Sequence, residues 1–283
     1  MFREPAILRK ADIEVSYHET NSCPSNIWRR IDVATGNDLL YMMFKARVEG
    51  VIILSNGNRL LGGFYGAAGE SRRPTAILLH GSPGIEKDLD FAYSMRDSGW
   101  NVLYFHYRGC WGSEGNYSLD GLLDDVKQAT GWTVKQPSVD LERLVLIGSS
   151  VGGYLTLRAG ASDRRFKALV SMCPLIDPAK FSLPLETWKE YAAMLHGVSA
   201  EELRKQMQEL PSALTFADGL RGRKILMVTA DEDAFFGPEY YQSFSKVMPH
   251  VRWCRFASAD HSFSTCRKQL IEKVMSWLSE ERI

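Results

Sequence analysis

Short apolar segments alternate with segments of helical periodicity from about residue 50 to the end of the chain. Many of the apolar segments are continuous runs, which is typical of parallel strands covered by helices on both faces. This alternation predicts a doubly wound α/β sheet. The expected strands are 51–54, 60–65, 75–79, 101–107, 144–147, 168–173, 225–229 and 251–256, and the expected helices are 88–97, 119–132, 151–160 and 269–278.

The first two expected strands are joined by Asn56 and Gly57, a pair that favours a tight hairpin. We therefore expect antiparallel strands at one edge of an otherwise parallel sheet. Two segments depart from the alternation. Residues 1–48 form an N-terminal extension with no clear period, and residues 175–222 form a helical insert with a capping-box pattern at Ser199. The remaining residues, 49–283, are expected to form one domain that carries this insert as a small cap.

Composition and charge exclude several classes of protein. The 34 basic residues balance the 34 acidic ones, so no overall positive field favours nucleic acid. The apolar content of 45% is too high for a disordered chain. No apolar run is long enough for a membrane span, and the charged N-terminus does not resemble a signal peptide. Five widely spaced cysteines without a CxxC pair predict a reducing, cytoplasmic location without a disulfide framework.

Residues 144–153 read Leu-Val-Leu-Ile-Gly-Ser-Ser-Val-Gly-Gly, which is an expected strand, a G-x-S-x-G motif and the start of an expected helix. A serine at the tip of such a turn has an exposed hydroxyl and a strained backbone. Gly148 and Gly152 leave room where the turn packs against neighbouring backbone. The helix N-terminus favours developing negative charge. Ser150 is therefore the candidate nucleophile. A glycine–serine turn without chemistry is the alternative interpretation.

A serine nucleophile needs a base, and His261 is the best placed of the six histidines. It follows the last expected strand, so it should lie at the same edge of the sheet as Ser150. The base in turn needs a carboxylate to orient it. Residues 230–237 follow the strand 225–229 and contain Asp231, Glu232 and Asp233, while Asp260 is a fourth candidate beside the histidine.

The order Ser150, Asp233, His261, each after a strand, resembles the α/β-hydrolase superfamily. Residues 107–115, Tyr-Arg-Gly-Cys-Trp-Gly-Ser-Glu-Gly, are similar to its R-G-x-G-x-S loop. The resemblance covers about residues 50–280. It implies the α/β-hydrolase fold, a mostly parallel eight-stranded sheet with helices on both faces. Laying the family's G-x-x-D-x-x-V-P stretch on residues 230–237 places Asp233 in the acid position, with Asp231 as the alternative acid.

The same resemblance implies an oxyanion hole made by the backbone N–H groups of Ser82 and Val151. His80 then has a structural place in the loop after its strand. Residues 261–263, His-Ser-Phe, and the terminal helix also look like the catalytic domain of prolyl-oligopeptidase-type peptidases. Those enzymes carry a large N-terminal propeller, and residues 1–48 are too few to form one.

These observations predict a serine hydrolase, above all a carboxylesterase that cleaves short- to medium-chain esters through an acyl-enzyme on Ser150. An amidase of small peptides or aminoacyl compounds, a thioesterase and an acyltransferase use the same machinery. A binding protein that kept the fold is the least favoured alternative. We expect a small-molecule ester as partner, with no nucleic acid, membrane, metal or cofactor, and self-association into a homo-oligomer stays open.

Two further groups of residues have alternative interpretations. Cys110 and Cys266 fall near the expected site, but a cysteine nucleophile is disfavoured because the turn already holds a serine. Aromatic and methionine residues of the insert either line a substrate pocket or form the core of the cap, and we expect both. These residues are Phe181, Trp188, Tyr191 and Met194.

Overall fold

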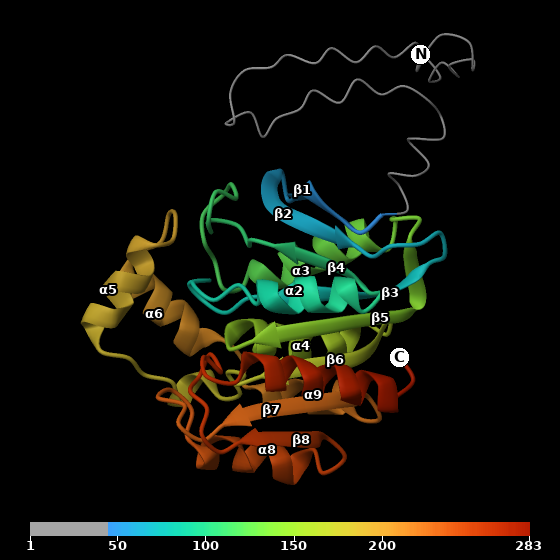
Figure 1. Ribbon diagram of the computed structural model, residues 1–283. Helices are drawn as coiled ribbons and strands as arrows, with labels where there is room; N and C mark the ends of the chain where they lie inside the picture. The colour runs from blue at the N-terminus through green and yellow to red at the C-terminus, as the bar shows by residue number, and fades with distance from the viewer. Residues whose placement is uncertain (1–44) are drawn as a thin grey trace, which may run out of the picture. The chain divides into compact units, whose positions relative to one another are not determined.

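An eight-stranded sheet crosses the protein, and the computed structural model describes residues 45–283 (Figure 1). The strand order is β1-β2-β4-β3-β5-β6-β7-β8. All neighbouring strands pair in parallel except β1–β2 and β2–β4, which are antiparallel. The strands are β1 (Arg47–Ser55), β2 (Asn58–Gly66), β3 (Arg73–Leu79), β4 (Asn101–Phe105), β5 (Val139–Ser149), β6 (Phe166–Met172), β7 (Lys224–Ala230) and β8 (Arg252–Phe256).

The edge hairpin forms at the predicted place. Ser55 pairs with Asn58, and the turn between them is Asn56-Gly57. Both turn residues have positive φ, 48° and 84°, which asparagine and glycine tolerate better than other residues. The predicted antiparallel addition at one edge of the sheet is therefore confirmed. Because β1 begins at Arg47, the sheet starts slightly before the expected boundary at residue 48, while residues 1–44 of the expected extension lie outside the described residues.

Helices cover both faces of the sheet, as the continuous apolar strands predict. α2 (Leu89–Asp97) and α9 (Arg267–Glu280) pack on one face, and α3 (Leu122–Thr133), α4 (Val151–Ser162) and α8 (Gln242–Val247) pack on the other. Alternate residues of each central strand supply the two cores. In β3, Ile77 contributes to the core with α3 and α4, whereas Leu78 contributes to the core with α2 and α9.

In the insert after β6, α5 (Leu185–Ala193) and α6 (Ala200–Glu209) extend past the carboxyl ends of the strands, on the left of Figure 1. Its capping box is present, because the Ser199 hydroxyl accepts the N–H of Glu202 while the Glu202 carboxylate accepts the N–H of Ser199. The insert consists of η1 (Pro178–Lys180), α5 (Leu185–Ala193), α6 (Ala200–Glu209), η2 (Ala213–Phe216) and α7 (Ala217–Leu220). Outside the insert, a short 3₁₀ helix, η3 (Pro238–Tyr241), follows β7.

Within residues 45–283, no helix is long and apolar enough to cross a membrane. The cysteines of this region are all free thiols, and they are Cys110, Cys173, Cys254 and Cys266.

Candidate active site

The turn between β5 and α4 presents Ser150 in a strained conformation. Its φ is 54° and its ψ −117°, values that a non-glycine residue rarely adopts. The turn is held by backbone hydrogen bonds, from the Ser150 N–H to the Met172 carbonyl at 2.9 Å and from the Leu175 N–H to the Ser150 carbonyl at 3.3 Å. A β-carbon on Gly152 would lie 1.9 Å from the Leu79 carbonyl oxygen, so this position has no space for a side chain.

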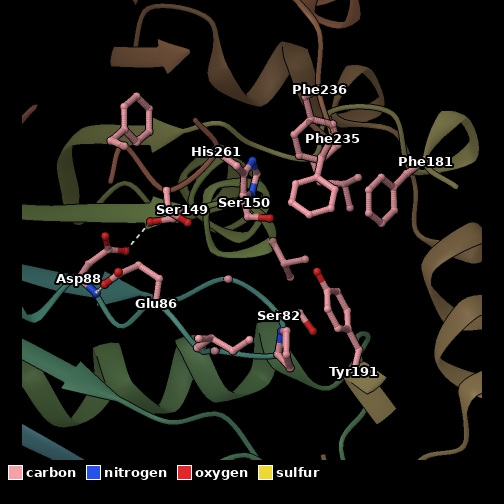
Figure 2. A pocket seen from close by; sticks show the side chains of 18 of the residues that line it. Ser82, Glu86, Asp88, Ser149, Ser150, Phe181, Tyr191, Phe235, Phe236 and His261 are labelled. Atoms are coloured by element: carbon pink, nitrogen blue, oxygen red, sulfur yellow. Dashed lines mark hydrogen bonds between the residues drawn. The ribbon is translucent and has the colours of Figure 1, made fainter. Parts of the chain in front are cut away.

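His261 lies beside Ser150 (Figure 2). Its ring is also hydrogen-bonded to Asp233. The distance between His261 Nδ1 and Asp233 Oδ2 is 2.7 Å, and the Asp233 side chain is completely buried. The other oxygen, Asp233 Oδ1, accepts the backbone N–H groups of Phe235 at 2.8 Å and Phe236 at 3.1 Å. A carboxylate held in this way can orient the imidazole with its Nε2 directed away from Asp233.

The alternative acid has a different partner. Asp231 forms an ion pair with Arg255 of β8, whereas the ring of His261 pairs with Asp233. Of the two acids left open by the sequence, the structure therefore brings Asp233, and not Asp231, to the histidine. Asp260 accepts the backbone N–H groups of Ser262 at 3.2 Å and Ser264 at 2.8 Å, so it stabilises the loop that carries the histidine.

A cavity of about 330 Å³ opens beside these residues. Ser150 and His261 lie in its wall, together with Ser82 and Val151, the two residues expected to form the oxyanion hole. Figure 2 shows Phe235, Phe236, Phe181 and Tyr191 around the same space. The apolar part of the wall consists of Ile85, Leu175, Phe181, Trp188, Tyr191, Met207, Phe235, Phe236 and Phe263.

The expected oxyanion residues border the nucleophile from two loops. Val151 is the first residue of α4, so its N–H has no carbonyl partner within the helix. Ser82 follows Gly81, whose position is so close to Ser150 that a β-carbon there would lie 3.1 Å from the Ser150 β-carbon. The Tyr117 hydroxyl donates to Ser82 Oγ at 2.9 Å and fixes this loop. The backbone N–H groups of Ser82 and Val151 are therefore candidates to donate hydrogen bonds to an oxyanion that forms near Ser150.

His80 is buried below the loop and does not line the cavity. Its Nδ1 lies 2.6 Å from the Gly81 carbonyl oxygen, and burial lowers its pKa to about 3. The neighbouring His106 also has a lowered pKa, about 4, through burial and the Lys87 charge. Because its ring lies outside the cavity wall, His80 has the structural place that the resemblance implies, and not that of a second base.

Cys110 and Cys266 do not supply a second nucleophile to this cavity. Cys110 is buried, which raises the pKa of its thiol, and neither it nor Cys266 lines the cavity. Two groups within residues 45–283 have donor spacing suited to a metal ion, namely Cys173 with Asp233 and His261, and Glu86 with Asp88 and Asp90. In both groups carboxylates are already bonded to other side chains, Asp233 to His261 and Asp88 and Asp90 to Arg267.

The sequence interpretation missed part of the cavity. Phe235 and Phe236 follow Asp233 and reach His261, with ring centroids 4.8 Å and 5.5 Å away. Asp88 and Arg267 also line the cavity, although they are separated by 179 positions in the chain. No local motif marks Asp88 and Arg267, and the sequence indicates Phe235 and Phe236 only as an apolar pair after Asp233. Of the insert's expected lining residues, Met194 is the exception, because it is 38% exposed and lies outside the cavity wall.

Structures of known proteins share this architecture. Est1E from Butyrivibrio proteoclasticus, solved with ferulic acid bound, superposes with a TM-score of 0.69 at 20% identity over 82% of this chain and 98% of its own. An esterase of Pyrococcus furiosus superposes with a TM-score of 0.67 at 19% identity over 90% of this chain and 96% of its own. At this level of identity the similarity shows the fold, and it confirms the predicted α/β-hydrolase architecture.

The chain is also similar to proteins known by sequence. It is 32% identical over 117 residues to acylamino-acid-releasing enzyme 1 of Oryza sativa, a match that covers 36% of this chain and 15% of the plant enzyme. Among the first curated relatives that it matches, the chain spans less than half of their length. The profile of the prolyl oligopeptidase family matches residues 90–281, which include Ser150, Asp233 and His261. The chain therefore belongs to the prolyl oligopeptidase family, a family of the serine-hydrolase type with the α/β-hydrolase fold.

Proposed function

We propose that the protein is a carboxylesterase that cleaves short- to medium-chain esters through an acyl-enzyme on Ser150. The observation that carries this proposal is the shared cavity, in which the strained Ser150 and the His261–Asp233 pair meet. Its volume of about 330 Å³ is at the small end of ligand pockets, and most of its lining is apolar. Both properties suit a compact neutral ester.

In this mechanism Ser150 Oγ attacks the ester carbonyl carbon while His261 Nε2 takes the hydroxyl proton. Asp233 holds the Nδ1–H and stabilises the imidazolium that forms. The N–H groups of Ser82 and Val151 stabilise the oxyanion of the tetrahedral intermediate. The alcohol then leaves with the proton from His261. A water molecule, activated by the same histidine, attacks the acyl-enzyme and releases the carboxylic acid and free Ser150.

An amidase acting on small aminoacyl compounds is the second candidate. It is favoured by the similarity to an acylamino-acid-releasing enzyme and by membership of a peptidase family. A panel of p-nitrophenyl esters from acetate to palmitate, with an aminoacyl anilide alongside, separates the two. We expect the highest kcat/KM for a short or medium ester. A clear preference for the anilide would contradict the esterase proposal.

The nucleophile itself is tested with a fluorophosphonate probe, which reacts with activated serines. The wild-type protein should be labelled at Ser150, and Ser150→Ala should lose both labelling and ester hydrolysis while its circular dichroism spectrum is unchanged. Ser262→Ala is the matched control, because Ser262 lines the same cavity and should leave labelling intact. Wild-type turnover in Ser150→Ala would overturn the assignment.

We further propose that residues 175–222 act as a cap that limits the chain length of the substrate. The contribution of Phe181, Trp188, Tyr191 and Met207 to the cavity wall supports this proposal. A cytoplasmic location remains our proposal as well, supported by the free thiols within residues 45–283. The small-molecule partner, without nucleic acid or membrane, is proposed on the neutral overall charge and the apolar cavity.

A further inference from the structure

An ion pair beside the nucleophile links three segments that are distant in the chain. Asp88, directly before α2, accepts the Ser149 hydroxyl with Oδ2 and Arg267 Nη2 with Oδ1, the latter at 2.8 Å. Ser149 is the residue before the nucleophile, and Arg267 is the first residue of α9. Figure 2 shows the bond between Asp88 and Ser149, with Ser150 on the next position.

Asp88 is built into this position. Its side chain is 4% exposed, and its backbone has a left-handed conformation with φ of 52° and ψ of 31°. Burial raises the pKa of its carboxyl, while the Arg267 charge and the two hydrogen bonds act in the opposite direction. Without the arginine, a buried carboxylate would be left without a compensating charge.

Arg267 extends the link to the loop that carries the base. Its Nη1 donates to the backbone carbonyl of Ser262 at 3.1 Å, directly after His261. Its other nitrogens bind Asp90 at 2.7 Å and 2.5 Å, so the guanidinium is held from two sides. The fork of one arginine therefore connects the histidine loop, through Asp88, to the turn that holds Ser150.

We propose that Asp88 and Arg267 are positioning residues that fix the distance between the nucleophile turn and the histidine loop. The proposal rests on the proposed serine hydrolase function. Proton transfer from Ser150 to His261 needs the two groups in one geometry, and a misplacement of 1 Å costs on the order of 100-fold in rate. Neither residue touches the reacting atoms. Each acts through a neighbour of a catalytic residue, Ser149 for Ser150 and Ser262 for His261.

A second buried ion pair supplies the matched control. Arg108 binds Asp125 with Nη2 to Oδ1 at 2.7 Å, and the two side chains are 14% and 0% exposed. The pair resembles Arg267–Asp88 in chemistry and burial, but neither residue lines the cavity. If ion pairs of this kind only stabilise the fold, removing either arginine should have the same consequences.

The experiment compares Arg267→Met with Arg108→Met at a temperature where both are folded. For p-nitrophenyl acetate we expect Arg267→Met to lower kcat by about 100-fold. KM should stay within about threefold, because acylation and deacylation both use His261 and slow together. Arg108→Met should keep kcat within about threefold of the wild type while lowering Tm. Arg267→Lys keeps the charge but not the planar fork, and its kcat should lie between that of Arg267→Met and that of the wild type.

Equal losses of kcat in Arg267→Met and Arg108→Met would overturn the positioning role. If Arg267→Met does not fold, the Arg267→Lys and Ser149→Ala single variants and their double variant decide. Both single changes interrupt the same link between the two loops. The double variant should therefore lose no more kcat than the single variant with the larger loss. Additive losses would contradict the proposal. Failure to label wild-type Ser150 with the fluorophosphonate would instead overturn the proposed function, and the positioning role with it.

Discussion

The two walls of the cavity are built in different ways. The strand-end wall contains Ser150 and His261, and hydrogen bonds fix it to the ends of the sheet. The insert wall contains Phe181, Trp188 and Tyr191, and the rings of Phe181 and Trp188 pack edge to face with centroids 6.0 Å apart. Hydrogen bonds impose direction, whereas apolar packing mainly imposes volume. We therefore expect the first wall to determine the reaction and the second to determine which substrate enters it.

The largest effect should come from the acid of the strand-end wall. Asp233→Asn keeps the shape but favours the wrong tautomer of His261, and we expect kcat to fall on the order of 10⁴-fold. The loss should be the same for p-nitrophenyl acetate and octanoate, because it concerns the reaction and not the fit. Steady-state kinetics with both esters test this. A loss confined to one ester would break the proposed division between the walls.

A substitution in the insert wall should alter preference instead. Phe181→Ala removes a ring from the cavity lining, so octanoate should gain about tenfold in kcat/KM relative to acetate. The kcat for acetate should change little. Leu185→Ala is the control, because Leu185 is exposed on α5 and outside the lining. An unchanged ratio of the two esters in Phe181→Ala would show that the insert does not set chain length.

Low pH should destabilise the folded protein through His80, which is buried below the loop after β3. Burial lowers its pKa to about 3, whereas the unfolded chain has the ordinary value near 6.5. Between these values the unfolded chain binds more protons, so stability falls as pH decreases below about 6.5, by about 1.4 kcal/mol per pH unit. Urea unfolding at pH 7 and pH 5 measures this loss, and His80→Asn should reduce the pH dependence. An equal reduction of the pH dependence in His250→Asn, where the ring is exposed, would contradict the attribution to His80.

The smallest effect should follow from the alternative acid. Asp231 is paired with the largely exposed Arg255, and such surface pairs contribute little. Asp231→Asn should therefore change kcat by less than about threefold for both esters. A loss comparable to that of Asp233→Asn would mean that the two carboxylates exchange roles during turnover.

The parts of the fold and site that local sequence determines were predictable. The continuous apolar strands indicate a covered parallel sheet, and the elbow around Ser150 is one uninterrupted motif whose glycines have a steric reason. β5 is longer than predicted, because residues 139–143 are largely polar and lie at the start of the strand, where part of it is exposed. Asp233 was identified through the family resemblance, since Asp231 has the same chemistry two positions earlier.

Contacts between distant side chains were not predictable in the same way. The Asp88–Arg267 pair joins residues 179 positions apart, and each taken alone is an ordinary charged residue next to a helix. Phe235 and Phe236 read as an apolar pair in a loop, and only the folded chain shows that they contact His261. Met194 has the same apolar character as its neighbours on α5, yet the helix ends before it and leaves it exposed.

One carboxylate connects the base to two aromatic residues of the cavity lining. Asp233 binds His261 with one oxygen and the backbone N–H groups of Phe235 and Phe236 with the other. The main chain that anchors the acid thus displays the aromatic rings beside the substrate. Because every residue except proline offers that N–H, these two side chains can change in the course of evolution without loss of the anchor. Descendants of such an enzyme can acquire new substrates while they inherit the same reaction.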